Sequence, residues 1–85
     1  MNISKHEQRV LHELAFGGAI HHERTDSGKI RAITCFTREG HVLSDCTFDV
    51  FMRLKKRRFI RSHNGKPYRA SRQGIQAVRA QLNQR

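Results

Sequence analysis

The stretch from Phe48 to Arg69, FDVFMRLKKRRFIRSHNGKPYR, limits most strongly what this chain can fold into. One helix face is indicated by the spacing of three apolar residues, Val50, Phe51 and Leu54. Four basic residues follow them, Lys55 to Arg58. Cations suit the carboxyl end of a helix, because they face the negative end of its dipole. Asn64-Gly65 stands further on between two short runs, and this dipeptide is the strongest short-range signal for a tight hairpin. The pattern predicts a helix closed by a basic hairpin, as in a winged helix.

The length of the chain allows one small domain, over residues 1–85. With 36% apolar and 28% charged residues, the composition is that of a globular protein. No apolar run approaches the ~18 residues of a membrane span, and the N-terminus lacks the apolar stretch of a secretory signal. We therefore expect a cytoplasmic protein without membrane contact, whose two cysteines are reduced thiols.

The net charge of +10 lies entirely in the second half of the chain. Residues 1–46 hold six Lys or Arg and six Asp or Glu, whereas residues 47–85 hold eleven Lys or Arg and only one acid, Asp49. Such asymmetry indicates an anionic partner: nucleic acid, an acidic protein surface or, less favoured, anionic lipid. The alternative is a basic face that serves only solubility.

A first helix is predicted from Ser4 to about Phe16. Ser4 and Glu7 have the spacing of a capping box, in which each side chain satisfies a free amide at the helix start. Gly17-Gly18 ends the helix, because glycine readily takes the left-handed conformation of a helix end. No phosphate-loop motif accompanies this pair, so we interpret it as a cap.

Two strands and a short third one are predicted next. Ala19–Arg24 and Lys29–Thr37 are joined by the turn-rich residues 25–28, and His41–Ser44 returns as a third strand. In the second strand an apolar set alternates with a mixed set: Ile30, Ala32, Thr34 and Phe36 with Arg31, Ile33, Cys35 and Thr37. One face is thus apolar and the other mixed, as expected for an antiparallel meander half covered by helices. The fold class is α+β, a winged-helix-like single domain.

The basic helix begins at a cap supplied by Asp45 or Thr47. On a helical wheel its outward face carries charged residues: Asp49, Arg53, Lys56 and Arg57. Phe48 and Met52 fall on the flank between this face and the core. We favour core packing for the pair, since large apolar pairs rarely stay exposed; if exposed, they are the natural anchor for a protein partner.

A two-residue turn fixes the expected register of the hairpin. It pairs His63 with Lys66, Arg61 with Tyr68 and Phe59 with Ala70. Pro67 lacks an amide proton, so its strand should lie at an edge. Ser71 then caps a last helix, with Gly74 as a modest weakness and three apolar residues at helical period: Ile75, Val78 and Leu82.

Metal and catalytic sites are poorly supported. His21 and His22 are adjacent on a strand and point to opposite faces. Cys35, His41 and Cys46 lack a CxxC pair and a fourth ligand for zinc. Cys46 lies beside the basic helix, but nothing supplies an oxyanion hole for a thiol nucleophile. We expect no enzyme activity, no metal and no cofactor.

Nucleic-acid binding has the best physical support. Cations on a helix face and a hairpin fit phosphate contacts, which give affinity and salt dependence but little sequence choice. The candidate residues are Arg53, Lys56 and Arg57 on the helix and Arg61, His63, Lys66 and Arg69 on the hairpin. Few polar uncharged residues accompany them, so we predict weak sequence specificity.

Several segments resemble the YjhX family of small bacterial proteins, also called TopAI. The resemblance rests on SKHEQRVLHELAFGGAI, CFTREGHVLSDCT, VFMRLKKRRFI with NGKPYR, and VRAQLNQR, and covers nearly the whole chain. It implies the toxin of a toxin–antitoxin pair that inhibits DNA topoisomerase I. The implied partners are that enzyme, or its DNA complex, and a cognate antitoxin. A non-enzymatic DNA-binding regulator remains the alternative.

Overall fold

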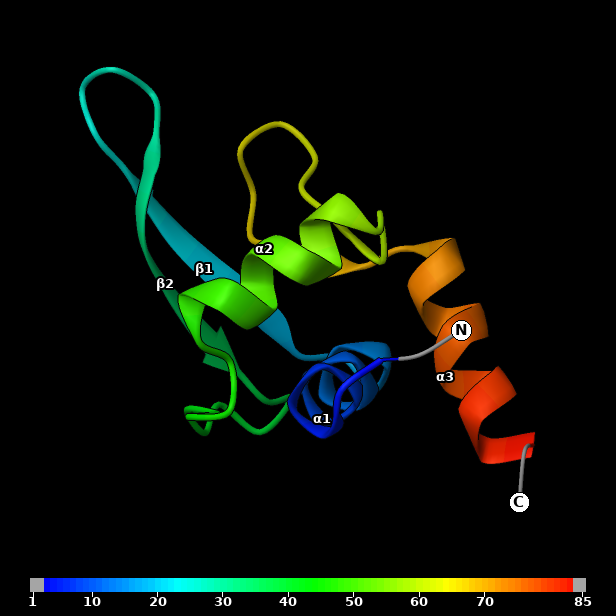
Figure 1. Cartoon of the computed structure of the whole chain (residues 1–85). Helices are drawn as coiled ribbons and strands as arrows, with labels where there is room; N and C mark the ends of the chain where they lie inside the picture. The colour runs from blue at the N-terminus through cyan, green and yellow to red at the C-terminus, as the bar shows by residue number, and fades with distance from the viewer. Residues whose placement is uncertain (1–2, 84–85) are drawn as a thin grey trace.

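The structure, a computed structural model, describes residues 3–83, and side chains as far as residue 80. The elements follow the order α1 (Lys5–Ala15), β1 (Ala19–Arg24), β2 (Ile30–Phe36), α2 (Phe48–Lys56), β3 (Ile60–Arg61), β4 (Arg69–Ala70) and α3 (Arg72–Asn83) (Figure 1). The β1–β2 hairpin projects beyond the helices, and the molecule is accordingly longest in one direction, 45 × 26 × 21 Å. The α+β class is confirmed. None of the helices within residues 3–83 is long and apolar enough to cross a membrane.

Helix α1 begins and ends at the predicted signals. The Ser4 hydroxyl accepts a hydrogen bond from the Glu7 amide at 3.2 Å. Phe16 is the C-cap, and Gly17 follows with φ +110°, a conformation that glycine adopts without strain. Gly18 is tightly enclosed, because a Cβ there would lie 2.6 Å from the Phe36 carbonyl oxygen.

Strands β1 and β2 pair antiparallel, with Ile20 opposite Cys35 and His22 opposite Ile33. The helices cover the side of the hairpin that carries Ile20 and Cys35. The mixed face of β2 is therefore the covered one, and it contributes the buried Cys35. Phe36, on the apolar face, is only half-buried. The alternation of residues along β2 did not identify the face that the helices cover. That face is recognised only when Cys35 is considered together with Ile20, its buried partner on β1.

The predicted third strand is reduced to one bridge. Val42 pairs with Phe36, and the Leu43 amide donates to the Cys35 carbonyl at 2.8 Å. Neither the segment after this bridge nor residues 37–41 form a strand. The Leu43 side chain nevertheless reaches the core.

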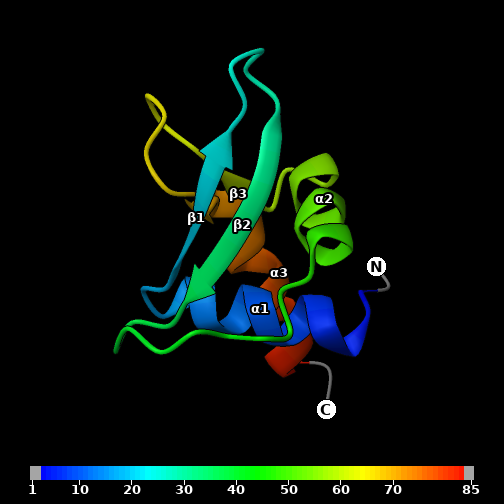
Figure 2. The ribbon, with the colours of Figure 1, turned by 90° about the vertical axis from the view of Figure 1, so that its left-hand side faces the viewer.

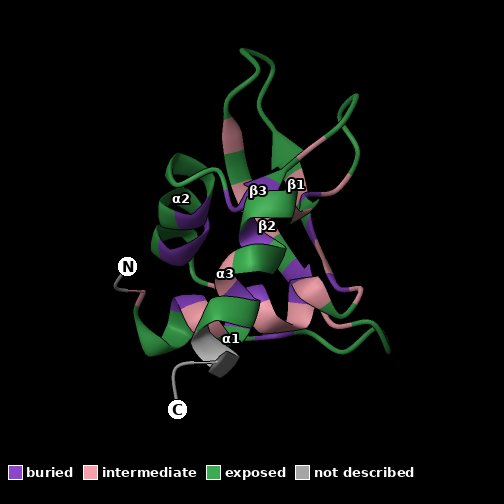
Figure 3. Ribbon diagram, turned by 90° about the vertical axis from the view of Figure 1, so that its right-hand side faces the viewer, coloured by how far each residue is buried: buried purple, intermediate pink, exposed green. Residues whose placement is uncertain are grey.

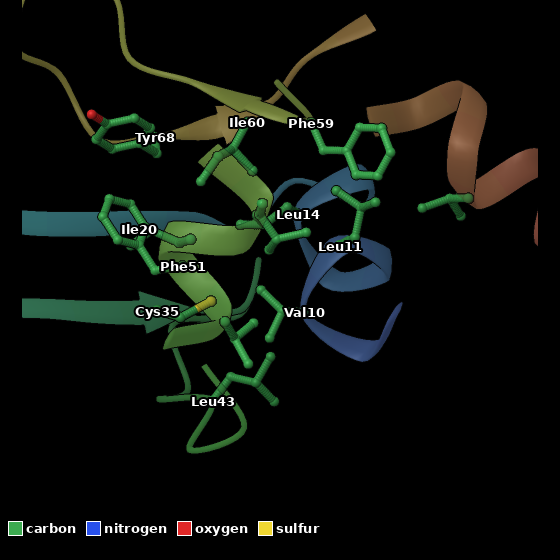
Figure 4. Close-up of a cluster of buried hydrophobic side chains, with 13 residues drawn as sticks. Val10, Leu11, Leu14, Ile20, Cys35, Leu43, Phe51, Phe59, Ile60 and Tyr68 are labelled. Atoms are coloured by element: carbon green, nitrogen blue, oxygen red, sulfur yellow. The ribbon is translucent and has the colours of Figure 1, made fainter. Parts of the chain in front are cut away.

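Helix α2 contributes its apolar face to the core as predicted. Val50, Phe51 and Leu54 are buried, and Phe51 packs edge-on against Tyr68 with ring centroids 5.0 Å apart. Figure 4 shows side chains of α1, α2 and the sheet meeting in this cluster. Of the two proposed caps, Thr47 is the one used, since its hydroxyl accepts from the Val50 amide.

The register of the second hairpin differs from the prediction by one residue. Asn64 and Gly65 both have positive φ, +55° and +76°, as a tight turn requires. Beyond the turn, however, Ile60 pairs with Ala70 and Arg61 with Arg69. Tyr68 pairs instead with Ile20 of β1, through two backbone hydrogen bonds of 2.8 and 2.9 Å. The predicted pairs Arg61–Tyr68 and Phe59–Ala70 are therefore wrong, because tertiary pairing with β1 takes up Tyr68.

Helix α3 is capped by Ser71, whose hydroxyl accepts from the Gly74 amide at 3.1 Å. Val78 is buried as predicted, whereas Ile75 is 37% exposed. The Leu82 side chain lies outside the described side chains. Gly74 is more than a weakness in the helix: a Cβ there would collide with the Phe59 carbonyl oxygen and lie 3.1 Å from Leu11.

The winged-helix comparison is not confirmed. The hairpin after α2 has only two residues in each strand, and β4 extends toward β1 through the bridge between Tyr68 and Ile20. The loops of both hairpins project toward the same end of the molecule (Figures 1 and 2).

Candidate partner-binding surface

Phe48 and Met52 form an exposed apolar pair on α2. Their exposed fractions are 42% and 44%, although the Phe48 ring lies 5.9 Å from that of the buried Phe51. The outward side of the α2 ribbon has the colour of exposed residues in Figure 3. Core packing of the pair, favoured from sequence, is therefore wrong, and the alternative of exposed side chains is the one observed. The cause is the angular position of Met52, which points away from the side covered by α1 and the sheet.

Arg53 and Arg57 lie at the junction of α2 with α1. Arg53 Nη1 is 3.6 Å from Glu7 Oε1, and Arg57 Nη1 is 4.0 Å from Oε2. The Glu7 side chain is only 3% exposed, whereas Arg53 is 61% exposed. A buried carboxylate is stable only with partners, so the two arginines have a structural role as well as an exposed surface.

The hairpin candidates are all exposed, and two of them face each other. Arg61 and Arg69 are direct cross-strand partners, so their side chains project on the same side. His63 and Lys66 flank the turn, where the Lys66 amide donates to the His63 carbonyl at 3.1 Å. This is a bond of the turn, and the strand pairs of the structure do not extend to His63 and Lys66.

The candidate basic residues of α2 do not all lie on one flank of the helix. Arg53 and Arg57 lie on the flank of α2 that faces α1, and Lys56 is exposed between the flanks. On the other flank Lys55 Nζ lies over the Tyr68 ring, 6.0 Å from its centroid. The candidate cations thus divide between the α1 side of α2 and the hairpin.

The two cysteines are neighbours in space. A hydrogen bond between their side chains, together with burial, raises the pKa of the Cys46 thiol. Cys46 is therefore protonated at neutral pH, which does not favour the thiolate that a nucleophile requires. Within residues 3–83 no group of three or more His, Cys, Asp or Glu side chains is placed to hold a metal ion, and this includes Cys35, His41 and Cys46.

Only part of the role of Glu7 at this surface was predicted from the sequence. Glu7 was recognised only as a capping residue, and its Oε1 does accept from the Ser4 hydroxyl at 3.1 Å. Its second role, beside two arginines of α2, joins residues more than forty positions apart. The one available signal was the excess of cations on α2 over its single acid, which left them free to meet an acid elsewhere.

Comparison with known proteins places the chain in a family. Residues 1–85 match the YjhX_toxin family, described as "Putative toxin of bacterial toxin-antitoxin pair". A UPF0386 protein of Parvibaculum lavamentivorans is 60% identical over 85 residues, with both chains covered completely. UPF0386 proteins of Brucella anthropi and Beijerinckia indica are 60% and 55% identical, also with complete coverage. No solved structure matches the chain. By its match over the full sequence, the chain belongs to the YjhX_toxin family.

Proposed function

We propose that this protein is the toxin of a toxin–antitoxin pair and inhibits DNA topoisomerase I by binding the enzyme or its DNA complex. The observation that carries the proposal is the match of all 85 residues to a family described as putative toxins of bacterial toxin–antitoxin pairs. Topoisomerase I as the target is what the resemblance to that family implies. The inhibitor acts by contact and not by catalysis. A cognate antitoxin neutralises it.

The surface of α2 offers a means of protein contact. Phe48 and Met52 are exposed by 42% and 44% and lie on a nine-residue helix anchored by three buried residues. Apolar anchors on a rigid element contribute most of the affinity in many interfaces. Lys56 lies on the same exposed side and would favour an acidic rim on the partner.

A pull-down with purified topoisomerase I tests the proposal. The tagged chain is mixed with the enzyme after nuclease treatment, and retention is measured together with relaxation of supercoiled plasmid. Retention without nucleic acid, with inhibited relaxation, is the expected result. Loss of retention after nuclease treatment, with no inhibition of relaxation, would count against the inhibitor.

Surface variants identify which residues carry the contact. Phe48→Ser with Met52→Gln should lower retention by at least tenfold. Phe16→Ser is the matched control, since Phe16 is 58% exposed at the end of α1. Equal loss in the control would contradict a specific role for the α2 pair.

A DNA-binding regulator of low sequence specificity is the second candidate, favoured by the eleven cations in residues 47–85. Reversal of Lys56, Arg61 and Lys66 to Glu should abolish DNA contact and leave protein contact intact. Arg53 and Arg57 are poor targets for reversal, because new carboxylates there would face the buried Glu7. Loss of both activities in the charge variant and in the Phe48 and Met52 variant would show one shared surface.

A further inference from the structure

A basic pocket that is open to solvent, called the cavity below, lies where the end of α2, strand β3 and the start of α3 meet. Its volume is about 250 Å³. The lining residues are Lys55, Arg58, Ile60, Arg61, Ser71 and Gln73. A water molecule takes up about 30 Å³ of liquid, so the cavity has room for a tetrahedral oxyanion. Sequence patterns had not singled out Lys55 and Arg58 as a site.

The charge of the lining has one sign. Lys55, Arg58 and Arg61 are cations, and none of the six lining residues is acidic. Arg69 does not line the cavity, but it lies directly opposite Arg61 in the β3–β4 pair. Like charges in this position destabilise a strand pair, so an anion bound at Arg61 would lower that cost.

Backbone contacts hold the cavity in shape without a ligand. Arg58 has φ +61°, and its amide donates to the Lys55 carbonyl at 3.0 Å. The Ser71 hydroxyl donates to the Arg58 carbonyl at 2.6 Å, and the Ser71 amide donates to the Phe59 carbonyl at 2.8 Å. Ser71 therefore fixes the chain that follows α2 against the start of α3, and preorganisation of this kind lowers the entropic cost of binding.

The same contacts place the positive end of α3 at the cavity. Ser71 accepts from the Gly74 amide, and Gln73 in the first turn of the helix lines the cavity. The start of a helix favours anions through its free amides and its dipole. Here that effect adds to three side-chain cations.

We propose that this cavity binds a phosphate group, supplied by a nucleic-acid backbone or by a free phosphate compound. A phosphate dianion presents several acceptor oxygens, which match the forked donors of two arginines, the ammonium of Lys55 and the helix start. A single carboxylate has fewer acceptors and less charge. The site does not depend on topoisomerase I as the target. With a nucleic-acid backbone as the source, it deepens the DNA-binding candidate above, which also uses Arg61.

Nuclear magnetic resonance of the full ¹⁵N-labelled chain tests the site. Inorganic phosphate is titrated at constant ionic strength, and the amide shifts of Arg72 and Gln73 are followed. We expect saturable shifts centred on these amides, with affinity at least fivefold lower in Arg58→Asn and in Arg61→Gln. Asparagine tolerates the left-handed conformation of residue 58, and Arg61→Gln provides a second variant on an exposed strand position if the first fails to fold. Lys29→Gln, an equal loss of charge on an exposed turn, is the control and should bind as the parent does.

A short mixed-sequence DNA duplex and a glutamate oligomer complete the test. DNA that shifts the same amides, with the same sensitivity to the variants, identifies a backbone phosphate as the source. Phosphate binding without such DNA shifts identifies a free phosphate compound, and either result supports the site. The proposal is overturned if phosphate shifts are spread over all basic residues, if Lys29→Gln loses as much affinity, or if the glutamate oligomer occupies the cavity more tightly than phosphate. None of these results depends on topoisomerase binding, so failure here leaves the pull-down result unaffected.

Discussion

Gly74 allows α3 to approach the chain that follows α2. A Cβ at this position would collide with the Phe59 carbonyl oxygen, and the backbone cannot move aside easily because Ser71 also bonds that carbonyl. Alanine is favoured over glycine in an exposed helix by about 1 kcal/mol. We nevertheless expect Gly74→Ala to lower the free energy of unfolding by about 1–3 kcal/mol, as in overpacked cores, measured by urea denaturation.

Gln76→Ala is the control for this substitution, because Gln76 is exposed on the same helix. It should leave the free energy of unfolding within about 0.5 kcal/mol of the parent. A Gly74→Ala protein as stable as the parent would show that the close approach is not maintained in solution.

His22 makes stability depend on pH. Its pKa is lowered by burial first, and then by the charges of Arg24, His21 and Lys55. Its Nδ1 atom is buried without a hydrogen-bond partner among the described residues, and its ring lies 5.1 Å from that of Tyr68. The unfolded chain therefore takes up a proton at His22 near pH 6.5, before the folded chain does. The stabilisation that neutral His22 gives the folded chain is therefore complete above pH 6.5 and is lost as the pH falls.

The expected result is that His22→Gln loses less stability than the parent between pH 7.5 and pH 5, measured by thermal unfolding. His63→Gln serves as the control, since His63 is exposed at the hairpin turn. An unchanged pH dependence in His22→Gln would contradict the assignment.

At the scale of elements, Glu7 connects α1 to α2. Its buried carboxylate faces Arg53 and Arg57, and removal of both cations would take away the two ion-pair partners that the described part of the chain gives it. We expect Arg53→Gln with Arg57→Gln to destabilise the protein by about 1–2 kcal/mol, a modest value because Arg53 is largely exposed to screening solvent. In a Glu7→Gln background the same pair should have little effect. Equal effects in both backgrounds, by chemical denaturation, would exclude coupling between the helices.

Elements set by local hydrogen bonds were predictable from the sequence. Ser4, Thr47 and Gly17 mark helix ends through contacts within a few residues, and Asn64-Gly65 marks its turn through backbone conformation. The covered face of β2, the hairpin register and the exposure of Met52 were not predictable, because each depends on a partner distant in sequence. The pairing of Tyr68 with Ile20 shows the cause, since a strand register obeys the sheet it joins as well as its own turn.

The features of the candidate site also divide into those that could be predicted from the sequence and those that could not. The candidate cations could be assigned to α2 and the hairpin from periodicity, and they are exposed in the structure. The exposure of Phe48 and Met52 was not predicted. Which cations meet an acid could not be predicted. Arg53 and Arg57 reach Glu7 only because α1 packs beside α2, and Lys55 reaches the cavity only because α3 begins there.

At the scale of the whole molecule, the position of charge matters more than its amount. The net charge of +10 resides in residues 47–85, while the remaining residues are balanced. Binding to DNA releases one condensed counterion for each phosphate neutralised, and the slope of log K against log salt is about −0.9 for each such contact. The salt dependence therefore counts the cations that touch DNA, whatever the total charge of the protein.

Two triple variants with the same net charge separate position from amount. Lys56, Arg61 and Lys66 changed to Gln should make the slope for a random duplex shallower by up to about 2.7, the value for three phosphate contacts. Lys5, Lys29 and Arg31 changed to Gln, on exposed positions of the balanced half, should leave the slope unchanged. Fluorescence anisotropy over a range of salt concentrations measures both slopes. If the two variants behave alike, only the total charge acts on DNA, and the surface of α2 and the hairpin has no special part in binding it.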